Sequence, residues 1–156
     1  MNRIVIAAAF LSTTIGVAAP GASQDVLAEH KIRSLKGLAA LAIVIRPSTD
    51  RDIASVKEWG DRLEVGLSRS IPSLGRSKTD NARAWLELGM VTTSSGAALE
   101  LSLYRWTRII DSGEEVFSKV WSDSRFSFGP TSDASLRDSL EKLVTSFSAD
   151  YLRANR

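Results

Sequence analysis

The chain has 156 residues, with 20 Lys and Arg against 18 Asp and Glu, which gives a formal net charge of +2 at pH 7, and it contains no cysteine. Without cysteine, disulfides, thiol catalysis, thiolate metal sites and a lipidated cysteine anchor are all excluded. Basic and acidic residues are interspersed along the chain, and this pattern argues against a nucleic-acid partner.

Residues 1–23 have the pattern of a secretory signal peptide. Arg3 supplies a positive start, an apolar run follows at 4–11, and small residues at 18–23 predict cleavage after Ser23. The apolar run is shorter than the roughly 18–20 residues that span a bilayer, so we expect no permanent membrane anchor. Export without cysteine suits a periplasmic or secreted protein.

The mature chain is predicted to comprise an N-terminal arm, residues 24–34, and a single α+β domain, residues 35–156. The arm is weakly amphipathic and suits either a short helix or an extended segment. Residues 38–45 form the most apolar run of the mature chain and predict a strand that is buried on both faces.

A helix is predicted to follow this strand. Ser55 and Glu58 have the spacing of a capping box, which makes Ser55 the first cap of a helix that runs to residue 70. Pro72 ends the helix, and the polar residues 73–81 predict a loop.

Three strands at 82–92, 97–110 and 114–124 are predicted next, joined by turns at 94–96 and 111–113. Each turn ends in glycine, which accepts a positive φ at little steric cost. The middle strand alternates strictly, so one of its faces is aliphatic and the other is polar and aromatic. The aliphatic positions are Leu99, Leu101 and Leu103, and the opposite positions are Glu100, Ser102, Tyr104, Trp106 and Arg108.

A last helix is predicted from residue 133 to residue 153, capped by Ser132. The order strand, helix, three strands, helix predicts an α+β two-layer sandwich, with a four-stranded, mostly antiparallel sheet and two helices on one face. The apolar stripe of the last helix is the clearest in the chain and comprises Leu136, Leu140, Leu143, Val144, Phe147 and Tyr151.

No residue is predicted to be catalytic, to bind a cofactor or to hold a metal. His30 is the single histidine, and a lone histidine is more often a solvated side chain than a ligand. Ser139 and Lys142 have the spacing of a serine–lysine motif, but its companion motifs are altered and stand in the wrong order. Glu114 and Glu115 are adjacent on a strand, point to opposite faces and cannot act as one acid–base pair.

The remaining signal is a set of aromatic side chains on the sheet face opposite the aliphatic positions. If both helices cover the aliphatic face, these rings are exposed and form a partner surface; alternatively, loops or the arm cover them, or they only stabilise cross-strand pairs. Whether Trp121 lies on the same face as these rings depends on the register of its strand. Arg105 then points toward the helices and needs a partner, or a bulge near Tyr104 that switches the faces. The predicted partner-binding residues are Trp85, Tyr104, Trp106 and Arg108.

Several short runs carry a resemblance to known proteins. Gly37 and Leu38 lead into the apolar strand, the third strand of the meander holds Val120-Trp121-Ser122, and the chain closes on Leu143-Val144, Phe147, Asp150-Tyr151-Leu152 and Ala154-Asn155. Over most of residues 35–155 the chain resembles a family of small, uncharacterised exported bacterial proteins, which implies no known activity. The element order is distantly similar to the N-terminal domain of the Tol–Pal periplasmic propeller protein and to envelope-transport accessory lipoproteins, whose anchoring cysteine this chain lacks. Such a likeness is only an analogy for function.

These observations favour a periplasmic, non-catalytic binding or accessory module of the bacterial envelope, acting through its aromatic sheet face or a sheet edge. The expected partner is an envelope protein, a peptide or a lipid component. Two alternatives stay open: a hydrolytic enzyme with an unrecognised site, and a self-associating structural protein, for example a homodimer.

Export is testable by intact-mass spectrometry of the protein recovered from the periplasm of an expressing host. We expect a chain that lacks residues 1–23 and begins at Gln24. A chain that retains Met1 and stays in the cytosol would contradict the predicted compartment.

Overall fold

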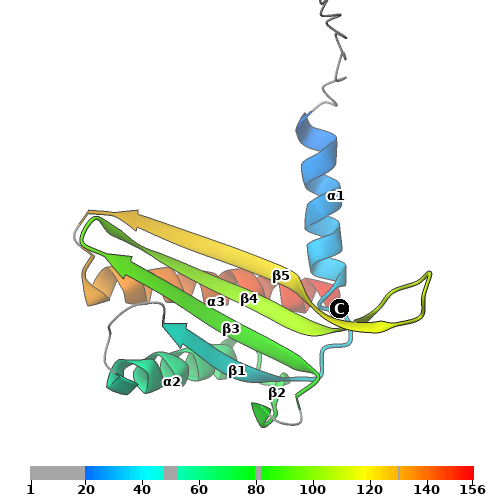
Figure 1. Ribbon diagram of the computed structural model, residues 1–156, viewed down its shortest axis with the longest axis horizontal. Coiled ribbons are helices and arrows are strands. Elements are labelled where there is room, and N and C mark those ends of the chain that lie inside the picture. The colour runs from blue at the N-terminus through cyan, green and yellow to red at the C-terminus, as the bar shows by residue number, and fades with distance from the viewer. Residues whose placement is uncertain (1–19, 48–52, 80–81, 130) are drawn as a thin grey trace, which may run out of the picture.

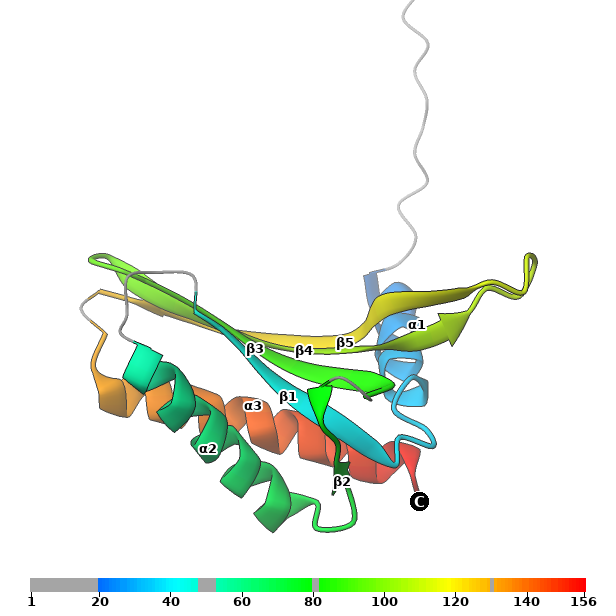
Figure 2. The same cartoon turned by 60° about the horizontal axis from the view of Figure 1, so that its bottom comes forward.

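The computed structural model describes residues 20–47, 53–79, 82–129 and 131–156. Within these ranges it consists of one five-stranded sheet with two helices on one face and a third helix beside the last strand (Figure 1, Figure 2). In chain order the elements are α1 (Pro20–Arg33), β1 (Ala40–Pro47), α2 (Ile53–Ser70), β2 (Gly75–Arg76), β3 (Ala84–Thr93), β4 (Gly96–Arg108), β5 (Glu115–Phe128) and α3 (Asp133–Ala154).

The strands are ordered β2-β1-β3-β4-β5 across the sheet. β3, β4 and β5 form the predicted antiparallel meander. β1 runs parallel to both β2 and β3, because α2 carries the chain back to the end of the sheet where β1 began. The α+β class is therefore confirmed, and the sheet is mixed, with its longest pairings antiparallel.

The predicted count of four strands and two helices is wrong in detail. Residues 73–81, expected to be a loop, contain β2: the Gly75 N–H donates to the Ala39 carbonyl at 2.8 Å and the Ser77 N–H donates to the Leu41 carbonyl at 3.0 Å. A strand of two residues is too short to show an alternating pattern in sequence. The additional helix is α1, which includes residues 24–33 of the expected arm.

Asn155 and Arg105 hold the end of α1 against the rest of the molecule. The Gly37 N–H donates to Asn155 Oδ1 at 2.9 Å, and the Asn155 amide donates to the Leu35 carbonyl at 3.2 Å. The Arg105 guanidinium donates to the Ser34 carbonyl at 2.8 Å. The last carbonyls of a helix have no partner within the helix, and these side chains supply donors to the turn that follows α1.

The two helices α2 and α3 bury the aliphatic face of the sheet (Figure 2). Leu99, Leu101 and Leu103 are all buried, as their alternation predicts. α3 begins at its predicted cap, where Ser132 Oγ accepts a hydrogen bond from the Ser135 N–H at 3.2 Å. The buried residues of α3 are the predicted stripe together with one serine: Leu136, Leu140, Leu143, Val144, Phe147, Ser148 and Tyr151.

Two expectations at the start of the domain need correction. α2 begins at Ile53 rather than at the predicted cap Ser55, whose side chain lies outside the described part of the chain. The β1 strand was expected to be buried, or nearly so, on both faces; Leu41 and Ala42 are buried, but the side chains from Ile43 to Arg46 are half-buried or exposed. Ile43 and Ile45 still pack against the core on the helix side of the sheet, where Ile45 lies beside Gly60 of α2.

The two glycines that end the predicted turns have different roles. Gly113 has a φ of 73°, as expected for a turn that needs a left-handed residue. Gly96 has no positive φ, so the predicted reason for glycine at this position is wrong. A Cβ atom at Gly96 would lie 2.5 Å from the Ser127 carbonyl oxygen, and glycine is therefore required by the close approach of β4 and β5.

The Phe147 ring lies at the centre of the core with no exposed surface. Phe147→Ala should lower the free energy of unfolding by about 3–5 kcal/mol, because it removes a large buried ring and leaves a cavity. Urea denaturation measures this loss. Leu152→Ala is the matched control on the same helix: nearly half of Leu152 is exposed, and its truncation should cost less than about 1 kcal/mol. Equal losses for the two variants would contradict the described core.

Candidate functional site

Four aromatic side chains gather on the sheet face opposite α2 and α3. We call them the aromatic cluster: Trp85 from β3, Tyr104 and Trp106 from β4, and Phe117 from β5. The Phe117 ring is at the centre, and its centroid lies 4.9 Å from that of Trp85, 5.5 Å from that of Trp106 and 6.0 Å from that of Tyr104. The strand register brings the rings together, because Trp85 pairs with Tyr104, Trp106 pairs with Phe117, and paired residues share a face.

The four rings are exposed to different extents. Trp106 is 45% exposed, whereas Trp85, Tyr104 and Phe117 are half-buried. The indole N–H of Trp85 is buried and has no hydrogen-bond acceptor in the described part of the chain. Ring packing, including the T-shaped contact with Phe117 at an interplanar angle of 63°, therefore fixes this side chain.

Phe117 is the member of the cluster that sequence reasoning missed, because a bulge interrupts the alternation of β5. Leu103 pairs with Trp121 and Tyr104 pairs with Lys119, which leaves Val120 as an extra residue. Phe117 and Trp121, which an unbroken alternation would place on one face, consequently lie on opposite faces. The signal available in the sequence for this position was a phenylalanine next to strand residues that are expected to be exposed.

Trp121 does not join the aromatic cluster. It is buried on the helix side, where its ring lies 5.0 Å from that of Phe147 and its Nε1 donates to Asp150 Oδ2 at 3.0 Å. The predicted bulge near Tyr104 has its extra residue in β5 and not in β4. The side chains of β4 therefore do not switch faces, and Arg105 remains on the helix side with backbone carbonyls as partners.

Arg108, the fourth predicted partner-binding residue, shares the open face but bonds to the turn between β4 and β5. Its Nε donates to the Gly113 carbonyl at 3.0 Å. In the strand register Arg108 pairs with Glu115, at the end of the hairpin beyond Trp106. The structure thus brings three of the four predicted residues together around Phe117 and places Arg108 at the border.

A group of polar side chains borders the cluster on the other side. Lys119 Nζ lies 2.7 Å from Glu100 Oε1, and Ser102 Oγ donates to the same oxygen at 2.9 Å. The hydrogen bonds from Lys119 and Ser102 lower the pKa of Glu100, and the bond to Glu100 raises the pKa of Lys119. Lys119 Nζ also lies 5.8 Å from the centre of the Tyr104 ring. Both groups are therefore charged at neutral pH and form a polar rim.

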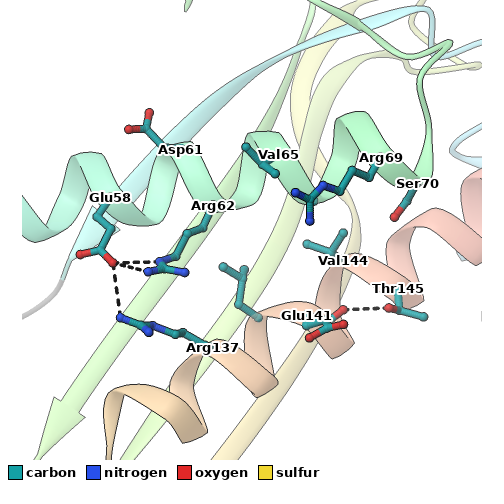
Figure 3. Close-up of a pocket in the computed structure, with 12 residues that line it drawn as sticks. Glu58, Asp61, Arg62, Val65, Arg69, Ser70, Arg137, Glu141, Val144 and Thr145 are labelled. Atoms are coloured by element: carbon teal, nitrogen blue, oxygen red, sulfur yellow. Dashed lines mark hydrogen bonds and ion pairs between the residues drawn. The ribbon is translucent and has the colours of Figure 1, made fainter.

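Apart from the aromatic cluster, a hollow of about 620 Å³ lies between α2 and α3 (Figure 3). The helices approach closely at Gly66, where a Cβ atom would lie 3.3 Å from the Val144 side chain. At one end Glu58 Oε1 accepts from Arg62 Nε at 2.9 Å and lies 3.6 Å from Arg137 Nη2. These charged groups already pair with one another, so a ligand in the hollow would compete with existing ion pairs.

Several other candidate groups stay apart in the structure. Within the described ranges, no three His, Asp or Glu side chains are grouped as metal ligands. His30 is exposed on α1, and the hydrogen bond of Lys142 goes to Asp138 at 2.7 Å rather than to Ser139. None of the described helices has the length and apolar character needed to cross a bilayer.

Comparison with known proteins gives a likeness of fold. No family model matches the sequence, and no curated protein matches it. The hypothetical protein CT253 from Chlamydia trachomatis is 10% identical, with 75% of this chain and 99% of that chain covered and a TM-score of 0.50. A PelC dodecamer from Paraburkholderia phytofirmans is 12% identical, with 70% and 86% covered and a TM-score of 0.39. A minor lipoprotein from Acinetobacter baumannii is 11% identical, with 74% and 95% covered and a TM-score of 0.37.

At these identities only the fold is shared, and only the first likeness is close enough to support it. The resemblance to the family of small exported proteins and the distant similarity to the Tol–Pal propeller protein stay predictions.

Proposed function

We propose that the protein is a non-catalytic binding or accessory module of the bacterial envelope, and that it holds its partner against the aromatic cluster. The main support is the position of four rings on a sheet face that α2 and α3 leave uncovered, with nearly half of Trp106 in water. Tryptophan and tyrosine bury much apolar area at a small cost in conformational entropy, and they are the residues most often found as anchors of interfaces.

The surroundings of the cluster favour a protein or peptide partner over a lipid. Glu100, Ser102 and Lys119 form a hydrogen-bonded rim on one side, and Arg108 lies at the other. An aromatic centre within a polar rim is the usual arrangement of a protein interface. The ion pair between Glu100 and Lys119 lies at the rim, where it contributes more to orientation than to affinity.

The compartment in this proposal is the periplasm. The signal-peptide pattern of residues 1–23 and the absence of cysteine support it. Cleavage after Ser23 would remove the first turn of α1 and keep the segment from Gln24 to Arg33. The bonds that Asn155 and Arg105 make after α1 would be retained in the mature protein.

The Trp106→Ala variant tests the proposal. It should lower the free energy of unfolding by about 1 kcal/mol or less, because much of the side chain is already in water, and should weaken partner binding by about 1–2 kcal/mol or more. Urea denaturation measures the first effect. A photo-cross-linking residue placed at position 106 in intact cells captures the partner. The loss of binding affinity caused by Trp106→Ala is then measured with that partner.

Leu152 provides the matched control position, because it is similarly exposed but lies on α3, which covers the opposite face of the sheet. A cross-linking residue there should not capture the same partner. A stability loss of about 3 kcal/mol or more for Trp106→Ala would place Trp106 in the core and contradict the proposal. Equal capture at the two positions would also contradict it.

A further inference from the structure

The outer edge of β5 is unpaired in the described sheet. β5 is the last strand in the order, and at 14 residues it is much longer than the usual strand of about 5–6. α1 covers the edge near Val120, where Ser34 Oγ donates to the Val120 carbonyl at 2.9 Å. Toward its C-terminal end, β5 runs away from α1 (Figure 1). A long open edge is a template for pairing with another chain.

The hydrogen bonds to β4 determine which residues face this open edge. The Gly129 N–H donates to the Ser95 carbonyl at 2.9 Å, toward β4. Backbone groups alternate in direction along an antiparallel strand, so those of Ser122, Ser124 and Phe126 point to the open edge.

Two charged neighbours satisfy the outward groups of Ser124 in the single chain. The Ser124 N–H donates to Asp123 Oδ1 at 2.9 Å, and the Ser124 carbonyl accepts from Arg125 Nη1 at 3.4 Å. Asp123 and Arg125 also form an ion pair with each other at 3.3 Å. Both side chains lie on the helix side of the sheet, because they pair with Leu101 and Leu99 of β4.

We propose that a second copy of this chain pairs with the edge of β5, antiparallel, about a two-fold axis at Ser124. In this register Asp123 lies opposite the partner's Arg125, and Arg125 lies opposite the partner's Asp123. Ser122 and Phe126 likewise lie opposite each other across the axis, and the three outward pairs give about six backbone hydrogen bonds.

The charges select this register over its neighbours. An axis moved by one residue would place Asp123 opposite the partner's Asp123, or Arg125 opposite the partner's Arg125, and like charges directly opposite each other are destabilising. With the axis at Ser124, the two ion pairs within the separate chains are exchanged for two between the chains. The Ser124 N–H and carbonyl exchange their hydrogen bonds to side chains for backbone hydrogen bonds to the second chain. Asp123 and Arg125 each keep an oppositely charged partner.

Exposed aromatic residues at the end of β5 supply the apolar part of the contact. Phe126 is 69% exposed and Phe128 is 94% exposed, both on the open sheet face. In the paired sheet Phe126 would pack beside the partner's Ser122. The aromatic cluster is not part of this contact, so the dimer and the proposed partner surface can be tested separately.

Single thiols report the register directly, because the chain contains no cysteine. Two Ser124 Cα atoms at the axis would be about 5.5 Å apart, a distance that a disulfide spans, whereas two Ser122 Cα atoms would be more than about 13 Å apart. The full chain carrying Ser124→Cys should oxidise to a covalent dimer on a non-reducing gel, and the matched Ser122→Cys variant should not. Equal cross-linking of both variants, or none with Ser124→Cys, would overturn the proposal.

Charge exchange provides the second test, measured by sedimentation equilibrium of the full chain. Arg125→Asp should weaken dimerisation at least about tenfold, because two pairs of carboxylates then face each other. The double variant with Asp123→Arg and Arg125→Asp should restore the dimer, since opposite charges face each other again. A chain that is monomeric at all concentrations would show that Asp123 and Arg125 protect the edge from pairing, and would overturn the proposal.

Discussion

The packing of α3 against the sheet is the contact on which the rest of the structure depends. The buried Phe147 ring lies 5.0 Å from Trp121 of β5, and the Trp121 indole donates to Asp150 of the same helix at 3.0 Å. Farther along α3, the Tyr151 hydroxyl donates to the Leu38 carbonyl at 3.1 Å, just before β1 begins. One helix therefore joins the last strand of the meander to the start of the first strand, and it keeps water from the aliphatic sheet face.

Covering one face in this way leaves the other face with different chemistry. Both helices that bury the aliphatic positions lie on the same side, so the open face has to be compatible with water. It meets this requirement with the Glu100–Lys119 ion pair and with rings that pack around Phe117. Such a face is stable in the free protein and still offers apolar area to a partner, and this combination is the physical basis of the proposed function.

The sequence was sufficient to predict the elements that have clear periodicity. The meander, the alternation of β4 and the stripe of α3 are all confirmed, because each repeats its pattern over several residues. β2 was missed because two residues show no pattern, and its pairing depends on where the chain lies in space.

A bulge near Tyr104 was anticipated, but not that its extra residue, Val120, lies in β5, and this placement decides the site. Phe117 and Trp121 are four residues apart, so an unbroken strand would place them on the same face. The bulge instead places Phe117 on the open face and Trp121 in the core. The Arg105 partner was equally hidden, since backbone carbonyls at the end of a helix carry no signal in sequence.

Hydroxyl-radical footprinting of the tryptophans, read by mass spectrometry, tests the central claim that one sheet face is covered and the other is open. The chain has four tryptophans; Trp59 of α2 and Trp121 of β5 are buried between the helices and the sheet, while Trp106 lies on the open face. The account predicts fast modification of Trp106 and protection of Trp59 and Trp121 in the folded protein. Protection of Trp106 equal to that of Trp121 would contradict it.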